Sequence, residues 1–207
     1  QALAGVRLVA GSVDVPVSAD IERGFGDDPQ AIAATIAEVI DAGAVGINIE
    51  DSIDGGTQRD IAEMQARIRG ARDGAGDFPL WINARVDAYL LGKSGDDVYS
   101  DTIARAAAWI AAGADSIFVP GPKDAGLIAQ LVADISAPLN VIVIDETTLS
   151  VAELKALGVA RVSTGPRLMQ AAMTGLHAAI RSIREDGDFR FLEDATGFGA
   201  LQKLMRH

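Results

Sequence analysis

The chain has 207 residues, of which 49% are hydrophobic and 23% charged, which suits a folded domain with a buried core. Its formal net charge of −11 argues against a nucleic-acid partner, because such proteins gather Lys and Arg into a basic surface. With no cysteine and two histidines, the sequence excludes disulfides, thiolate catalysis and sites that need several Cys or His ligands. It also lacks a membrane-spanning apolar run and a signal-peptide pattern, so we expect a cytoplasmic protein that acts on small molecules without a membrane partner.

A unit of Ala-rich helix, glycine and short β-branched strand recurs along the chain. In the three plainest copies the helical pattern stops at Gly43, Gly113 and Gly158, since glycine adopts the left-handed conformation that ends a helix. The strands that we expect cover residues 15–20, 45–50, 80–85, 116–119, 139–144 and 159–163. Strands that alternate with helices in this way predict a parallel α/β sheet.

The sheet could be a closed barrel or an open doubly wound sheet. Asp20, Glu50 and Arg85 stand at the ends of different strands, and barrel enzymes draw their catalytic groups from many strand ends. No glycine-rich phosphate motif follows any strand, as an open nucleotide-binding sheet would require. We therefore expect a (β/α)8 barrel of the TIM type, forming one domain over residues 1–207. Six strands fall short of eight, and residues 1–13 read as the end of a helix, so we expect the first strands to precede Gln1.

The C-terminal part, residues 167–207, has a helical pattern without strands. Residues 167–185 predict one long helix with an apolar stripe that includes Leu168, Leu176 and Ile180. A weaker amphipathic segment follows at residues 190–207. This segment either packs on its own barrel or contacts another subunit, and the pattern alone does not choose between them.

The first chemical cluster lies where the strand 15–20 runs into its loop. Asp20 and Glu22 are two residues apart, and Gly24 lets the loop bend around a ligand. Magnesium prefers carboxylate oxygens and keeps several waters, so one or two such acids suffice to bind it. The alternative is that these acids are solvated. Asp28 is better explained as the cap of a helix that starts at Pro29.

Two more clusters end the next strands. Glu50 closes an apolar strand, where a carboxylate is unfavourable unless it is paired or bound to metal, whereas capping accounts for Asp51. Arg85 and Asp87 follow the strand 80–85. Arg85 could stabilise a developing enolate beside the metal or form an internal salt bridge, and the two roles are compatible. Asn140, also on a strand, is a further candidate for substrate contact.

Four segments, SADIERGFG, INIEDS, INARVDAYL and LGVARVSTGP, together resemble the isocitrate lyase and phosphoenolpyruvate mutase superfamily. The resemblance implies a (β/α)8 barrel with magnesium that cleaves or forms a C–C or P–C bond beside a 2-oxo carboxylate, through an enolpyruvate-like intermediate. It also implies that Asp20, Glu22 and Glu50 contact the metal directly or through water, and that Arg85 contacts the substrate. Family members commonly form tetramers that exchange a C-terminal helix between subunits. The resemblance therefore also implies a homo-oligomer, either a tetramer or a dimer.

The departures from the family pattern narrow the expected reaction. The chain has no cysteine, which isocitrate lyases use for catalysis, and Ser52 stands where the mutases carry a lysine. We therefore expect a magnesium-dependent lyase that cleaves a C–C bond in a small 2-oxo or 2-hydroxy carboxylate, with Glu50 and Arg85 catalytic and with Arg85 and Asn140 binding substrate. The alternatives are a phosphonopyruvate hydrolase or phosphoenolpyruvate mutase, and an inactive barrel that serves as a binding or assembly subunit.

Overall fold

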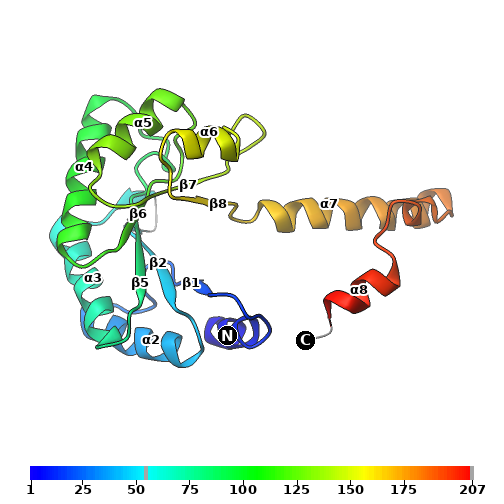
Figure 1. Ribbon diagram of the computed structural model, residues 1–207, viewed down its shortest axis with the longest axis horizontal. Helices are drawn as coiled ribbons and strands as arrows, with labels where there is room; N and C mark the ends of the chain where they lie inside the picture. The colour runs from blue at the N-terminus through cyan, green and yellow to red at the C-terminus, as the bar shows by residue number, and fades with distance from the viewer. Residues whose placement is uncertain (54–55, 206–207) are drawn as a thin grey trace. The chain divides into compact units, whose positions relative to one another are not determined.

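The computed structural model describes residues 1–53 and 56–205, which fold into alternating strands and helices (Figure 1). The helices are α1 Ala2–Ala10, α2 Pro29–Asp41, α3 Ile61–Ala75, α4 Asp96–Ala111, α5 Ala125–Asp134, α6 Val151–Ala156, α7 Arg167–Arg181 and α8 Phe198–Leu204. The strands are β1 Ser18–Asp20, β2 Gly46–Glu50, β3 Ser52–Ile53, β4 Thr57–Gln58, β5 Trp81–Arg85, β6 Ser116–Phe118, β7 Leu139–Ile142 and β8 Arg161–Ser163. The chain divides into two compact units, Gln1–Ser163 and Thr164–His207.

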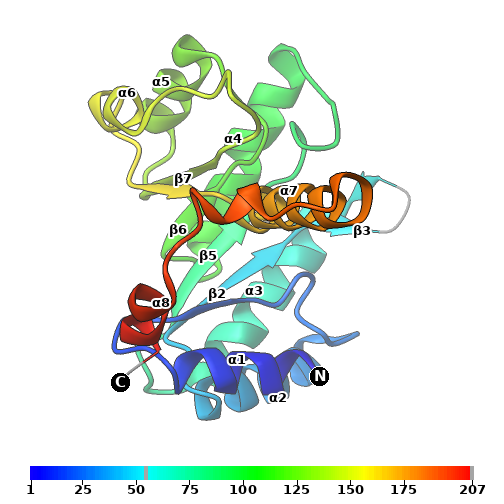
Figure 2. The same ribbon diagram turned by 90° about the vertical axis from the view of Figure 1, so that its right-hand side faces the viewer.

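The first unit is built on a six-stranded sheet in the order β1-β2-β5-β6-β7-β8, and every neighbouring pair is parallel. Figure 2 shows the strands following one another across this sheet, which curls like half of a barrel. The predicted α/β class and all six predicted strands are confirmed, although β1 begins at Ser18 and β8 at Arg161, later than expected. The antiparallel pair β3–β4 that follows β2 was not predicted from the sequence.

The two faces of the sheet differ in polarity because side chains alternate along each strand. One face carries residues such as Ile47, Ile82 and Ile117, which are fully buried in the core beneath the helices. Helices α2 to α5 lie on this side of the sheet (Figure 1). The other face, called here the polar face, carries Asp20, Asn48, Glu50, Asn83, Arg85, Ser116 and Asn140. The strand register places these residues side by side.

Helices α2 and α3 pack backbone to backbone through two glycines of α3. A Cβ atom added to Gly70 would lie 2.4 Å from the carbonyl oxygen of Pro29, and one added to Gly74 would lie 2.4 Å from that of Ala33. Side chains larger than hydrogen at these two positions would therefore force the helices apart.

At the start of α2, Asp28 accepts a hydrogen bond from the backbone N–H of Ala31 at 2.8 Å, which confirms the predicted cap.

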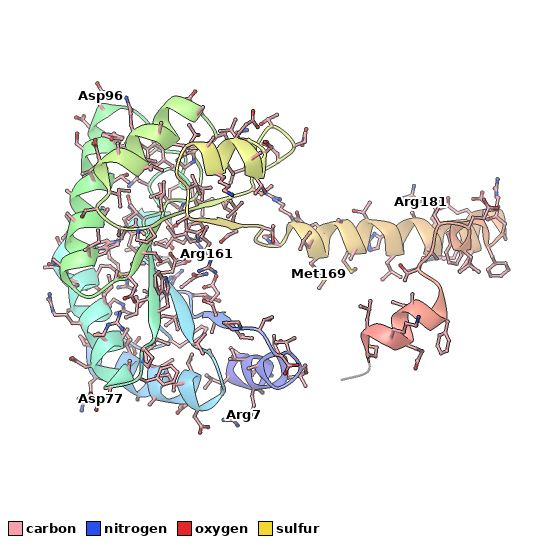
Figure 3. All side chains as sticks on the ribbon, in the orientation of Figure 1. Arg7, Asp77, Asp96, Arg161, Met169 and Arg181 are labelled. Carbon is pink, nitrogen blue, oxygen red and sulfur yellow. The ribbon has the colours of Figure 1, made fainter. Side chains whose placement is uncertain are left out.

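The second unit contains the predicted C-terminal helix, α7, followed by a π-helical turn at Ser182–Asp186 and a short 3-10 helix at Arg190–Leu192. Its predicted apolar stripe is exposed, with Leu168 70% and Leu176 51% accessible. Met169 and Arg181 project from α7 in Figure 3. Residues 206 and 207 of the second predicted segment lie outside the described residues. Among the residues that are described, no helix is both long and apolar enough to cross a membrane.

Candidate active site

Three of the residues singled out in the sequence end neighbouring strands of the sheet. Asp20 closes β1, Glu50 closes β2 and Arg85 closes β5. The parallel register pairs Glu50 with Arg85 directly, so their side chains leave the same edge of the sheet on the polar face. The carboxyl ends of parallel strands are where α/β enzymes place their reactive groups.

The guanidinium of Arg85 joins two carboxylates. Its Nη1 lies 2.9 Å from Oε2 of Glu50, and its Nε donates a hydrogen bond to Oδ1 of Asp87. The ring of Phe118, on the next strand, lies 5.6 Å from the guanidinium carbon. Asp87 is fully buried, and the side chains of Glu50 and Arg85 are 15% and 17% exposed. The salt bridge that the sequence analysis offered as one role of Arg85 is therefore formed.

The site carries more negative than positive charge. Burial raises the pKa of Glu50 above its usual value, the hydrogen bond from Ser52 and the charge of Arg85 lower it, and Asp87 and Asp20 raise it further. The hydroxyl of Ser52 donates to Oε1 of Glu50 at 2.7 Å. Three carboxylates against one guanidinium leave two unbalanced negative charges when all of them are ionised. A divalent cation would neutralise this excess.

Asp87 gives a second indication that the site accepts a further group. Its Oδ2 atom is buried and has no hydrogen-bond partner among the described residues. A buried carboxylate oxygen without a donor is unfavourable by about 1–3 kcal/mol or more. An ordered water or a hydrated ion beside Arg85 would supply the missing donor.

The residues present fit magnesium as a partly hydrated ion. Asp20 and Glu22 are exposed, and the backbone N–H of Glu22 donates to Oδ1 of Asp20 at 2.9 Å. Within residues 1–53 and 56–205, no three Asp, Glu, His or Cys side chains are gathered closely enough to enclose a metal. The donors are hard oxygens, however, and magnesium commonly binds one or two carboxylates while water and substrate complete its octahedron. Asp20, Glu22 and Glu50 thus remain the predicted ligands.

Asp51, which was expected to be a simple cap, makes several long-range contacts in the structure. This fully buried side chain accepts hydrogen bonds from the backbone N–H of Asp87 at 3.0 Å and from Gln58 at 3.0 Å. It also pairs with Arg105 of α4 at 3.2 Å. Burial raises the pKa of Asp51 to about 6. Asp51 therefore links the ends of β2 and β5 to helix α4, and no sequence motif marked Arg105 as its partner.

A second polar network crosses the polar face below these charges. Asn83 donates to Asn48 at 2.8 Å and accepts a hydrogen bond from Ser116 at 2.7 Å. Asn140, the predicted substrate-binding amide, is fully buried and bonds to Ser163 of β8 at 3.1 Å. It is paired in register with Phe118, which separates it from Arg85 by one strand. The structure thus places Asn140 on the same face as the carboxylates but not in contact with them.

An open cavity of about 780 Å³ lies between the loops that follow β5 and β6. Lys93 and Lys123 line it, but Asp20, Glu22, Glu50 and Arg85 do not. Lys93 donates to Gln58 at 2.9 Å, and Lys123 pairs with Asp145 at 2.9 Å. The cavity therefore does not include the cluster at the strand ends, and both of its lysines already have a partner side chain.

Known proteins are similar to this chain in sequence. An uncharacterized protein of Mycobacterium tuberculosis (strain ATCC 25618 / H37Rv) is 38% identical over 186 residues, which cover 90% of this chain and 67% of that protein. The oxaloacetate decarboxylase of Paraburkholderia xenovorans (strain LB400) is 28% identical, over 89% of this chain and 65% of that enzyme. The chain thus spans about two thirds of the length of these relatives.

A solved structure agrees with these relatives. The crystal structure of a phosphonopyruvate hydrolase complex with oxalate and Mg²⁺ is 26% identical and matches with a TM-score of 0.85, over 98% of this chain and 72% of that one. The sequence profile of the phosphoenolpyruvate phosphomutase family matches residues 1–184. These matches confirm the resemblance seen in the four motifs. The chain belongs to the phosphoenolpyruvate phosphomutase family, within the isocitrate lyase and phosphoenolpyruvate mutase superfamily.

Proposed function

We propose that this protein is a magnesium-dependent lyase that cleaves a C–C bond in a small 2-oxo or 2-hydroxy carboxylate through an enolpyruvate-like intermediate. The observation that carries the proposal is the cluster at the strand ends, where Arg85 lies between Glu50 and Asp87, and Asp20 contributes to their electrostatics. This arrangement combines an excess of carboxylate with one fixed cation. It suits a substrate that brings a divalent metal ion and its own negative charge.

The predicted site residues then have distinct roles in binding the metal and the substrate. Asp20 and Glu50 would hold the ion, and Glu22 would act directly or through water. When bound, magnesium supplies Lewis acidity at the 2-oxygen of the substrate. Arg85 directs its remaining N–H groups to the substrate and stabilises the negative charge that develops on the 2-oxygen. Asn140 is proposed as a further hydrogen-bond partner of the substrate.

For a 2-oxo dicarboxylate the proposed reaction is a decarboxylation. The bond from C3 to its carboxylate breaks, carbon dioxide leaves, and the electron pair forms the enolate, which then takes up a proton at C3. A retro-aldol cleavage of a 2-hydroxy acid is the second version of the same chemistry. The likeness to an oxaloacetate decarboxylase supports the first version.

Phosphorus–carbon chemistry is the alternative function, because a phosphonopyruvate hydrolase shares the fold at 26% identity. In this chain Ser52, whose hydroxyl donates to Glu50, stands where the mutases carry a lysine. The replacement of that lysine by serine is the reason to favour C–C cleavage over rearrangement of a phosphonate. An inactive barrel that serves only in assembly is the third candidate.

We infer that the six parallel strands are part of a closed (β/α)8 barrel whose interior is the polar face. We also propose a homo-oligomer, a dimer or a tetramer, with α7 at a subunit contact. The exposed stripe of Leu168, Leu176 and Ile180 supports this contact. Light scattering coupled to gel filtration tests the proposed oligomer. Finding only monomers at micromolar concentration would overturn this proposal.

The decisive experiment is an assay of the purified protein on a panel of 2-oxo and 2-hydroxy dicarboxylates and on phosphonopyruvate, with and without magnesium. We expect magnesium-dependent release of pyruvate or of a related 2-oxo acid, abolished in Asp20→Ala and Glu50→Ala. Asp41→Ala is the matched control, because Asp41 is exposed and its partner among the described residues is Arg7 on the surface. Phosphate release would favour the hydrolase, and no turnover on any substrate would favour the inactive barrel. Full activity in both site variants would overturn the metal assignment.

A further inference from the structure

The loop after β1, residues 21–28, is held in a backbone conformation that its sequence does not favour. Glu22 and Phe25 both have φ of 50°, in the left-handed region that non-glycine residues rarely occupy. Each such residue costs about 1 kcal/mol or more, and it persists only where the surrounding structure imposes it. This loop, called here the β1 loop, carries the predicted ligand Glu22. Some other part of the protein must therefore fix its shape.

The β1 loop is bonded directly to the candidate site at its start. The carbonyl oxygen of Glu22 accepts a hydrogen bond from the backbone N–H of Glu50 at 2.8 Å, and the N–H of Glu22 bonds to Asp20. The three predicted metal ligands are thus joined through the left-handed residue Glu22. A change in the loop conformation would move Glu22 relative to Asp20 and Glu50 and would break these two hydrogen bonds.

The side chain that fixes the rest of the β1 loop is Arg67 of α3. Its guanidinium donates to three backbone carbonyl oxygens of the loop: those of Arg23 at 3.0 Å, Gly26 at 2.5 Å and Asp27 at 3.1 Å. Arg67 is only 4% exposed, and its contact with the half-exposed Glu63 is long, at 3.8 Å. The loop carbonyls therefore provide most of the partners that make burial of this charge tolerable.

The packing of the two helices explains how Arg67 reaches the loop. Gly70 lies one turn further along α3, on the face that touches Pro29 at the start of α2. The β1 loop leads directly into Pro29. Arg67 therefore projects beneath the loop at a place fixed by a backbone contact that tolerates no side chain.

We propose that Arg67 is a positioning residue for the metal site. It holds the β1 loop so that Asp20, Glu22 and Glu50 keep their mutual arrangement, and it thereby sets the affinity for a divalent ion. The inference rests on the proposed function for the identity of the ion. The hydrogen bonds by which Arg67 orders the β1 loop do not depend on which ion is bound. No atom of Arg67 needs to touch the metal or the substrate.

The test compares Arg67→Gln with Arg72→Gln. Arg72 is a matched control, because it lies on the same helix and also binds backbone carbonyls, those of Leu80 at 2.7 Å and Gly113 at 2.6 Å, far along the chain from the β1 loop. Both substitutions should lower the melting temperature. Only Arg67→Gln should weaken the binding of Mn²⁺, measured by electron paramagnetic resonance, by about 10-fold or more. Arg67→Lys, which keeps the charge but not the planar fork, should recover part of that loss.

Hydrogen exchange of residues 21–28 without metal gives a readout that does not depend on metal binding. Exchange of these amides should be faster in Arg67→Gln and unchanged in Arg72→Gln. The proposal is overturned if Arg67→Gln binds Mn²⁺ like the wild type, if its loop exchange is unchanged, or if Arg72→Gln weakens binding equally. If the wild type binds no Mn²⁺, the proposed function fails, while the exchange comparison still decides whether Arg67 orders the loop.

Discussion

The Nη1 atom of Arg85 lies 2.9 Å from Oε2 of Glu50, across two parallel strands whose register pairs these two residues. Both side chains are largely buried, so their charges are stabilised mainly by each other and by Asp87 on the far side of the guanidinium. Removing a single member of such a group leaves a buried charge without its partner. The pair therefore combines structural and chemical roles.

Replacing Arg85 by Met should lower the free energy of unfolding by about 2–3 kcal/mol, because Glu50 and Asp87 would lose their shared cation. Adding Glu50→Gln to this variant should restore part of the loss, since the uncompensated charge is then removed. Urea denaturation of the single and double variants measures both effects. Equal stability of Arg85→Met and wild type would show that the pair is solvated.

Under the proposed function, Arg85→Lys should keep most of the stability but reduce kcat by about 100-fold.

The two acids of the β1 region should contribute unequally to metal binding. Both residues are exposed, but Asp20 ends a strand of the sheet, whereas Glu22 lies in the β1 loop at a left-handed backbone position. Calorimetric titration with Mg²⁺ or Mn²⁺ should show a loss of affinity of about 100-fold for Asp20→Asn, and of about 10-fold for Glu22→Gln, as expected of a ligand that acts through water. A larger loss for Glu22→Gln would reverse these two roles.

Ionisation of Asp51 should reduce the stability of the protein as the pH rises. Its folded pKa is raised from 3.8 to about 6, chiefly by burial, so between these values the folded state binds more protons than the unfolded state. The stabilising contribution is therefore complete below pH 3.8 and is lost as the pH rises through 6. Relative to Asp51→Asn, the wild type should lose about 2 kcal/mol between pH 4 and pH 7. Urea denaturation at several pH values tests this, and a constant difference would contradict it.

The contact between α2 and α3 predicts a sharp penalty for an added methyl group. Gly70→Ala should destabilise the protein by about 1–3 kcal/mol, since the new Cβ would lie 2.4 Å from a backbone oxygen of Pro29. Gly5→Ala in helix α1 is the control, because a Cβ there meets nothing within 4 Å and alanine favours a helix. Thermal denaturation should show a lower melting temperature for the first variant only. A comparable drop for Gly5→Ala would remove the steric explanation.

Local sequence signals predicted the six strands and most of the helices because they depend on nearby residues. The glycines at 43, 113 and 158 all have positive φ and follow their helices, as expected. The β3–β4 pair was missed because two residues per strand are too few for a periodic pattern. The short bounds of β1 and β8 reflect hydrogen bonds to a neighbouring strand, which no local pattern reports.

Strand-end position was enough to identify Asp20, Glu50 and Arg85 as candidates, and the family motifs assigned them roles. Asp51 looked like an ordinary cap because its partner Arg105 is 54 residues away on α4. Arg67 carried no motif at all, and its contacts with the β1 loop span 40 to 44 residues of sequence. Long-range contacts of this kind depend on how the helices pack, so they cannot be predicted from composition and residue spacing alone.

The sequence by itself determined that this is a parallel α/β protein with carboxylates and an arginine at its strand ends, because alternation, glycine stops and strand-end charges are local properties. The tertiary structure decided how those charges are shared. It placed Arg85 between Glu50 and Asp87, buried Asp51 against Arg105, and set Arg67 beneath the loop that carries Glu22. Burial and distance between residues far apart in the chain control charge energies, and only the packed fold fixes both.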